Sequence, residues 1–153
     1  MATIAACLIV KDEIEYIKRI LDNINPWVDG IFIYDTGSTD GTQEVARSCG
    51  ATGVQGVWRK DFAAARNCSF DLPGAEYDWI VYFDADDQVD GLDKLRGLAD
   101  NAISSVDAFS FPYHNDWSGI EVNYYTTRMV RRSSGHRWRY PLHEQLEMDG
   151  REH

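Results

Sequence analysis

Residues 31–41 read IFIYDTGSTDG, which is an apolar run followed by a short polar turn. Asp40 near the end of the turn can cap a helix, and Gln43 follows three residues later, as in a helix-capping box. A strand, a polar turn and a helix in this order form a βα unit. The stretch therefore predicts an α/β fold.

The same alternation continues on both sides of this unit. Residues 3–10 form a continuous apolar run and predict a buried strand, and Pro26 ends the helix expected after it. That helix has apolar residues at helical spacing, namely Ile14, Ile17, Leu21 and Ile24. Strands alternating with helices indicate a mostly parallel sheet flanked by helices. The later elements expected are a weak strand over 52–57, a short helix over 62–70, an apolar strand over 79–83 and a helix over 92–101.

The last part of the chain has a different pattern. A strand is expected over 108–113, and the helical period disappears after His114. Residues 122–130 are rich in Tyr, Thr and Val, and residues 138–146 mix aromatic and charged side chains, which favours strands and loops. No repeat or linker divides the sequence. We therefore expect one domain over 1–153, with a β-rich C-terminal part.

Composition limits the kinds of partner and the location. The chain has 153 residues, of which 44% are apolar, and a formal net charge of -10, which opposes general attraction to nucleic acid or anionic lipid. The N-terminus has no basic leader, and its apolar run reaches Lys11 too soon for a membrane span, so we expect a cytoplasmic protein. The cysteines have no C-x-x-C spacing and are expected to be reduced thiols: Cys7, Cys49 and Cys68.

Three carboxylates follow the apolar strand over 79–83. Asp84, Asp86 and Asp87 are crowded there, and like charges at this density cost free energy unless a cation is present. Oxygen ligands suit Mg²⁺ or Mn²⁺, which share phosphate oxygens of a substrate. The alternative is an acidic turn that only caps the next helix. Because the polar segments after the first two strands reach the same edge of a parallel sheet, we favour a site for a metal and a diphosphate.

The polar segments also resemble those of a known family. Residues 31–42 are similar to the nucleotide-binding strand and turn of glycosyltransferase family 2. Further similar segments follow the order and spacing of bacterial members and cover nearly the whole chain: residues 8–13, Trp58, residues 61–67 and residues 84–87. Trp138 and the pair His143-Glu144 match the branch that contains peptide S-glycosyltransferases and lipopolysaccharide-core glucosyltransferases. The resemblance implies a GT-A-like fold with a nucleotide-binding part over 1–113 and an acceptor- and metal-completing part over 114–153.

The resemblance also implies roles in binding the nucleotide. Asp35 would accept a hydrogen bond from the nucleobase, uracil above all, and Glu13 would lie near the ribose. Turn formation and helix capping are the alternatives for both. Arg66 would reach the diphosphate, and Asp61 would reach the base or the protein scaffold. An Arg–Asp brace inside the fold is the alternative for this pair.

The acidic segment would hold Mn²⁺ or Mg²⁺. By resemblance, Asp86 would bind the metal directly, Asp84 would contact ribose or metal, and Asp87 would lie behind the ligands or face the sugar. His143 would complete the metal ligands, and Glu144 would act as the general base.

Two assignments near the C-terminus keep alternatives. Successive side chains of an extended segment point in opposite directions, so His143 or Glu144 can be structural, and Asp116 is the rival base. A basic cluster can screen the leaving diphosphate or an anionic acceptor, the alternative being a solvated strand face: Arg128, Arg131, Arg132, Arg137 and Arg139.

The implied reaction is an inverting transfer of a sugar from a nucleoside diphosphate, UDP in particular, to a saccharide, a lipid-linked saccharide or a peptide. Gln88 opposes a phosphatase, and the lack of a Gly-rich loop with Lys after Val10 opposes a nucleotidyltransferase. A non-catalytic nucleotide- or sugar-binding module is the third alternative. Relatives usually continue beyond the His-Glu pair, so a truncation, an oligomer that completes the site or a minimal enzyme would explain the end at His153.

Overall fold

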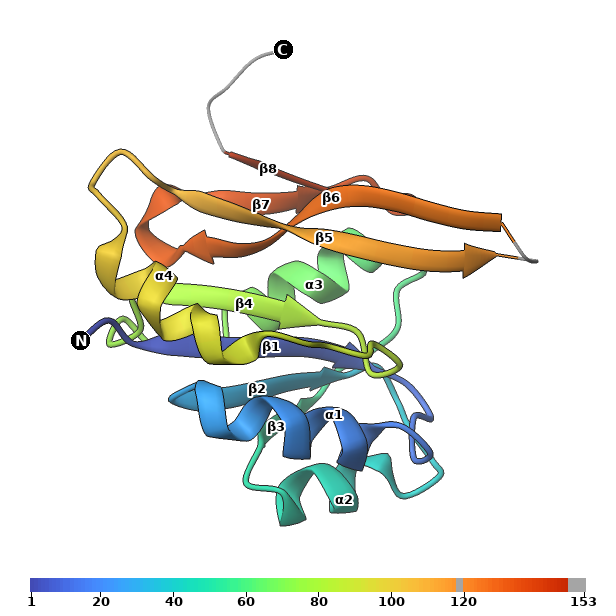
Figure 1. The fold of residues 1–153 in the computed structure, drawn as a ribbon. Coiled ribbons are helices and arrows are strands. Elements are labelled where there is room, and N and C mark those ends of the chain that lie inside the picture. The colour runs from blue at the N-terminus through green and yellow to red at the C-terminus, as the bar shows by residue number, and fades with distance from the viewer. Residues whose placement is uncertain (118–119, 149–153) are drawn as a thin grey trace.

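The computed structural model describes residues 1–117 and 120–148, and the side chains at 115–117 and 120 lie outside this description. Its main element is a six-stranded sheet in the order β3-β2-β1-β4-β6-β5 (Figure 1). Strands β1 to β4 are parallel, and β6 and β5 are antiparallel to their neighbours. The strands are β1 (Ile4–Val10), β2 (Gly30–Asp35), β3 (Thr52–Gln55), β4 (Trp79–Phe83), β5 (Ala108–Trp117) and β6 (Ile120–Arg131). A smaller antiparallel sheet pairs β7 (His136–Arg139) with β8 (Gln145–Met148).

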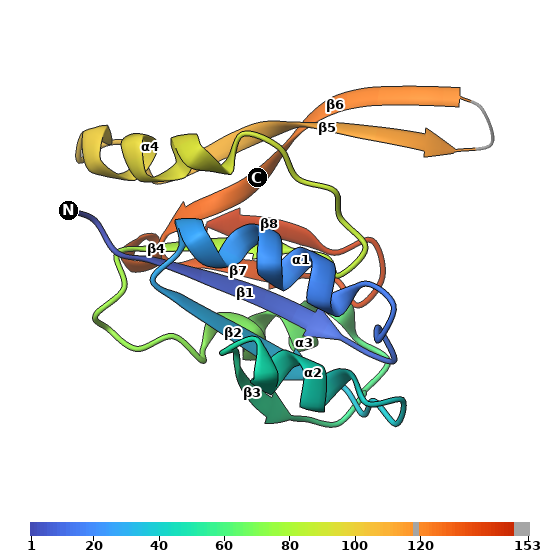
Figure 2. The same ribbon diagram turned by 60° about the horizontal axis from the view of Figure 1, so that its bottom comes forward.

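Helices cover both faces of the main sheet. Figures 1 and 2 show α1 and α2 on one side of β1 and β2, and α3 on the other side. The α-helices are α1 (Ile17–Ile24), α2 (Thr42–Ser48), α3 (Phe62–Phe70) and α4 (Leu95–Asn101). Short 3-10 turns occur at Asn25–Trp27, Leu92–Lys94 and Arg132–Ser134. The described part of the chain has no helix long and apolar enough to cross a membrane.

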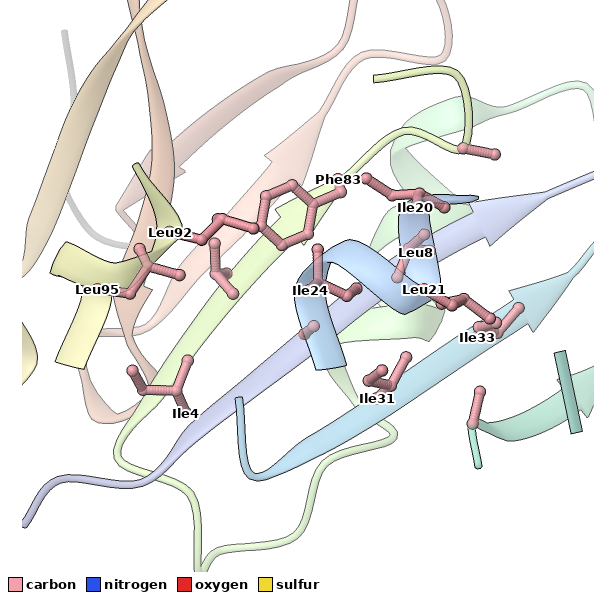
Figure 3. Packing of buried hydrophobic residues seen from close by; sticks show 14 of the residues in the cluster. Ile4, Leu8, Ile20, Leu21, Ile24, Ile31, Ile33, Phe83, Leu92 and Leu95 are labelled. Carbon is pink, nitrogen blue, oxygen red and sulfur yellow. The ribbon is translucent and has the colours of Figure 1, made fainter. Parts of the chain in front are cut away.

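The larger hydrophobic core lies between the sheet and the helices α1, α2 and α4. Alternate residues of β1 point into it, and α1 meets them with its apolar face (Figure 3). Fully burying one such aliphatic side chain is worth about 1.5–3 kcal/mol, so this face stabilises a helix that is too short to persist alone. The α1 residues are Ile17, Ile20, Leu21 and Ile24.

A second cluster packs on the opposite face of the sheet. Cys7, Tyr82 and Val130 from three strands meet Phe70 of α3 and Trp138 of β7. The ring centroids of Tyr82 and Trp138 are 4.8 Å apart in an edge-to-face arrangement, which favours aromatic pairs. This cluster places α3 and the β7–β8 sheet beside the carboxyl half of β4.

The sequence predicted several elements closely. The helix expected over 62–70 and the strand expected over 79–83 match α3 and β4 to the residue. The apolar run at residues 3–10 corresponds to β1, whose residues are buried except one, Ile9. The helix expected over 92–101 consists of a 3-10 turn followed by α4.

Two local expectations are wrong. Helix α1 starts at Ile17 and not at Ile14, because the N–H groups of Tyr16 and Ile17 both donate to the Glu13 carbonyl and close a turn first. Ile14 is 41% exposed.

Asp40 does not occupy the cap position of α2. Gly41 takes that position with φ 99°, a left-handed conformation that glycine adopts without a Cβ clash. Asp40 instead accepts hydrogen bonds from the Thr42 backbone N–H at 3.0 Å and from the Thr42 hydroxyl at 2.6 Å.

The strand order places a crevice between β1 and β4. From β1 the chain moves to β2 and β3 on one side, and it then crosses over to β4 on the other side. In open parallel sheets, ligands bind at the carboxyl ends of strands where the order reverses in this way. The segments that follow β1 and β4 are therefore the ones to inspect.

Candidate functional site

A cleft of about 490 Å³ opens at the carboxyl ends of β1 and β4. Its volume lies in the usual range for small-molecule sites. Predicted site residues from four separate parts of the chain line it together: Glu13, Arg66, Asp84, Asp86, His143 and Glu144. Lys11, Thr36, Trp58 and Phe62 line it as well. The polar segments after successive strands therefore converge, as their order along the chain predicts.

Helix α3 attaches one wall of the cleft to the rest of the fold. Asp61 caps the helix, because its Oδ1 accepts the Ala64 N–H at 2.8 Å. The Phe62 N–H donates to the Pro141 carbonyl at 3.0 Å. The Asn67 side chain donates to the Trp138 carbonyl at 3.0 Å and accepts the Trp138 N–H at 2.9 Å. This helix thus fixes the backbone on both sides of Tyr140.

Arg66 on α3 links the two chemically important ends of the cleft. Its Nη2 donates to Asp84 Oδ1 at 2.7 Å, and its Nε donates to Glu144 Oε1 at 2.8 Å. The guanidinium carbon lies 4.9 Å from the centroid of the Trp138 ring, within the range of a cation–π contact. Arg66 therefore forms an internal brace with Asp84 and Glu144 instead of with Asp61, and it also lines the cleft.

Arg128 on β6 holds the acidic segment from the other side. Its Nη1 lies 3.1 Å from Asp87 Oδ2 and 3.4 Å from Asp84 Oδ2. Asp87 Oδ2 also accepts the Asp84 backbone N–H at 2.8 Å. The Tyr113 hydroxyl donates to Asp87 Oδ1 at 3.4 Å. These contacts fix the turn that follows β4.

The charges around this turn shift the affinity of its carboxyl groups for protons. Burial opposes the charged form of Asp84, but Arg66 and Arg128 outweigh it and hold the pKa of Asp84 below its usual value. Burial raises the pKa of Asp87, and Arg128 only partly offsets this. Burial also raises the pKa of Glu13, with Asp86 as the next contribution.

Asp86 differs from its two neighbours. Its side chain is exposed at the cleft, and its carboxylate has no hydrogen bond or ion pair within the described part of the chain. Both oxygens of Asp84 already face arginines. No group of three or more His, Cys, Asp or Glu side chains among the described residues is arranged to hold a metal. The acidic turn therefore offers Asp86 as its open carboxylate, and a cation there would take most of its ligands from substrate phosphate and water.

His143 and Glu144 both line the cleft although they are adjacent in the sequence. His143 has φ 55°, which interrupts the extended conformation in which successive side chains point in opposite directions. Glu144 Oε1 accepts from Arg66, and its Oε2 has no hydrogen-bond partner among the residues described. One oxygen is thus oriented by the protein while the other is open for a proton.

The matching family is glycosyl transferase family 2, whose model covers residues 6–146. The chain belongs to this family. A TPR repeat-containing protein of Synechococcus elongatus is 32% identical over 94% of the chain, and glycosyltransferase SunS of Bacillus subtilis is 28% identical over 94%. These matches cover 35% and 34% of the relatives, so the chain spans about one third of their length.

The solved structures confirm the fold of this family 2 chain. Glucosyl-3-phosphoglycerate synthase from Mycobacterium tuberculosis, in complex with uridine diphosphate, superimposes with a TM-score of 0.58. The match covers 70% of this chain and 43% of that one, at 23% identity. Together with the six-stranded sheet, this confirms the predicted GT-A-like α/β fold and the β-rich C-terminal part.

Other predicted site residues of the family 2 chain lie outside the main cleft. Asp35 is 2% exposed, and its Oδ1 accepts the N–H groups of Gly37 and Ser38, both at 2.7 Å. Its Oδ2 is buried and has no partner in the described part. Asp61 and Asp87 do not line the cleft. Asp61 caps helix α3, and Asp87 pairs with Arg128. The backbone of Asp116 pairs with Glu121 in the β5–β6 hairpin, and its side chain lies outside the described residues.

The predicted basic cluster does not gather at the cleft. Arg131 lies 4.5 Å above the Trp79 ring, Arg132 donates to the Pro73 carbonyl, and Arg137 pairs with Asp71 at 2.8 Å. Arg128, by contrast, contacts Asp84 and Asp87 of the acidic segment. Sequence reasoning missed this role, although Arg128 is the one charged residue within 122–130, and a single charge in such a strand indicates a buried partner.

Proposed function

We propose that this chain is a metal-dependent, inverting glycosyltransferase that moves a sugar from UDP to an acceptor. The observation that carries the proposal is the convergence of Arg66, Asp86 and Glu144 on one cleft at the strand-order reversal of a family 2 chain. Arg66 provides a positive charge for a diphosphate, Asp86 provides a carboxylate for a metal, and Glu144 provides a carboxylate that can accept a proton.

Asp35 and Glu13 would bind the nucleoside. A buried carboxylate oxygen without a partner is costly, and Asp35 Oδ2 is such an oxygen. The imide N–H of uracil would satisfy it, while Gly37 and Ser38 keep the other oxygen in place. Glu13 lines the cleft beside Asp86 and would accept a hydrogen bond from a ribose hydroxyl.

Asp86 would bind Mg²⁺ or Mn²⁺, with His143 as the further protein ligand at the cleft. When bound, the cation would offset the negative charge that develops as the diphosphate leaves. Arg66 faces the same space and would hold an oxygen of the diphosphate without leaving Asp84, since a guanidinium has five N–H donors.

Glu144 would act as general base. Its Oε2 would take the proton from the acceptor hydroxyl or thiol as the acceptor atom bonds to the anomeric carbon. The bond from that carbon to the diphosphate oxygen breaks in the same step, so attack from the opposite face inverts the anomeric centre. Arg66 would orient the carboxylate through Oε1 during this transfer.

Replacing Glu144 with Gln tests this function. The change should leave UDP affinity nearly unaltered and lower sugar transfer by about 10²- to 10⁴-fold, the usual contribution of a positioned base. The assay follows UDP release from a panel of UDP-sugars with Mn²⁺ and with water, a saccharide or a peptide as acceptor, and NMR identifies the product anomer. Glu147→Gln on β8 is the matched control, because it removes a carboxylate from the same segment outside the cleft.

Three outcomes would contradict parts of the proposal. UDP binding without sugar release from any donor would indicate a binding module. A retained anomeric configuration would exclude the inverting step. If Glu144→Gln transfers sugar at the parent rate, the general base is Asp116 or a group of the acceptor itself.

A further inference from the structure

Two arginines and three aromatic rings pack together beside the cleft. Arg66 contacts Trp138 and Tyr82, and Arg128 contacts Tyr82 and Tyr113. The distances between guanidinium carbon and ring centroid are, in that order, 4.9, 5.4, 4.8 and 4.9 Å. Each arginine thus contacts two aromatic rings, which restricts the position of its guanidinium group.

Both arginines reach the acidic turn. Arg66 takes one oxygen of Asp84, and Arg128 takes the other and also takes Asp87 Oδ2. The side chains of Arg66 and Arg128 are only 11% and 13% exposed, so solvent screens these pairs little. Of the three carboxylates after β4, Asp86 therefore stays open to the cleft.

A cluster of three free carboxylates would bind a divalent cation by itself, as oxygen-rich calcium loops do. One carboxylate in contact with water binds Mg²⁺ or Mn²⁺ weakly, and the cation then needs further oxygens from a diphosphate. Because Arg66 and Arg128 pair with Asp84 and Asp87, the turn presents one free carboxylate instead of three.

We propose that Arg128 is a positioning residue that withholds Asp84 and Asp87 from the cation, so that the acidic turn binds the cation only together with a nucleoside diphosphate. The inference rests on the proposed function for the identity of the second ligand. It makes cation binding and donor binding one coupled event. A purely structural Arg128 would lower stability when replaced, but its loss would not shrink the gain in Mn²⁺ affinity on adding UDP.

The test is Mn²⁺ binding by Arg128→Met, measured by calorimetry without nucleotide and again with UDP. Loss of one positive charge beside the turn should tighten Mn²⁺ binding without UDP by roughly tenfold or more. The further gain on adding UDP should shrink in this variant, because Asp84 and Asp87 then compete with phosphate oxygens as ligands. Arg128→Lys keeps the charge and should bind Mn²⁺ without UDP nearly as weakly as the parent.

Arg137→Met is the matched control, since Arg137 also pairs with an aspartate but outside the cleft. Its Mn²⁺ affinity should equal that of the parent. Arg128→Gln removes the charge and keeps an amide donor, so it provides the same test if the Met variant does not fold. The inference is overturned if folded Arg128→Met and Arg128→Gln bind Mn²⁺ without UDP no more tightly than the parent does. It is also overturned if Arg128→Lys binds Mn²⁺ as tightly as these uncharged variants.

The same experiment distinguishes a failure of the proposed function from a failure of the role given to Arg128. If UDP does not tighten Mn²⁺ binding to the parent, the metal-dependent donor site is wrong. The effect of Arg128 on Mn²⁺ affinity without UDP is still measured in that case.

Discussion

Replacing Asn67 with Ala should destabilise the protein and loosen the segment that carries Glu144. The Asn67 side chain makes two hydrogen bonds to the backbone of Trp138, which lies 71 positions later in the sequence. Trp138 is 6% exposed, so water does not readily replace the lost partners. This pair of hydrogen bonds is therefore a polar link between α3 and β7.

The magnitude follows from those two bonds. Each hydrogen bond contributes about 0.5–1.5 kcal/mol net, and a buried group left without its partner costs about 1–3 kcal/mol. Because the link is only part-buried, we expect a total loss of about 2–4 kcal/mol in the free energy of unfolding. For a chain of this length that corresponds to a fall in Tm of roughly 4–16 °C.

Urea unfolding and thermal unfolding measure the loss, and hydrogen exchange locates it at the Trp138 amide. Asn101→Ala is the control, because Asn101 donates one exposed hydrogen bond to Gly97 within its own helix. That variant should change stability by less than about 0.5 kcal/mol. An Asn67→Ala protein as stable as the control, with the Trp138 amide still protected, would refute the role given to Asn67.

Further predictions concern the nucleobase, the metal and acid stability. Asp35→Ala should weaken UDP binding and leave Mn²⁺ affinity nearly unchanged. Equal competition of UDP and GDP for the parent would contradict the proposed contact between Asp35 and uracil. His143→Ala should reduce Mn²⁺-dependent UDP affinity, because the cation would lose its imidazole ligand, and calorimetry of UDP binding with and without Mn²⁺ in both proteins checks this. The pKa of Asp84 is lowered in the folded state, so its contribution to stability is present above the unfolded pKa of about 3.9 and is lost as pH falls through the folded value. The difference in unfolding free energy between the parent and Asp84→Asn, measured in urea, should therefore shrink below about pH 4, and a constant difference would exclude ionisation of Asp84 as its source.

The elements that sequence predicted best are those whose signal is local. A run such as Trp79 to Phe83 has no polar residue and can be satisfied only in a buried strand. The polar residues after β1, β2 and β4 could be assigned to one edge because parallel strands place their carboxyl ends together. Of the six predicted site residues that line the cleft, Glu13, Asp84 and Asp86 lie there for this reason.

The contacts that sequence could not predict join distant residues. Arg66 meets Glu144 only after the β7–β8 sheet packs on α3, and Arg128 meets Asp87 only because β6 pairs antiparallel with β4. Neither pairing leaves a periodic pattern in the chain. His143 and Glu144 both line the cleft because His143 has a left-handed backbone conformation. A prediction that treats the segment as extended does not anticipate this.

Calorimetry of UDP binding with and without Mn²⁺, in the parent and in Asp86→Asn, tests the proposed donor site most directly. Asp86 has the exposed carboxylate that is free of protein partners in the described part of the acidic turn. Mn²⁺ should tighten UDP binding to the parent by about tenfold or more, and this coupling should disappear in Asp86→Asn. Equal UDP affinity with and without Mn²⁺ in both proteins would contradict a metal and diphosphate site at this cleft.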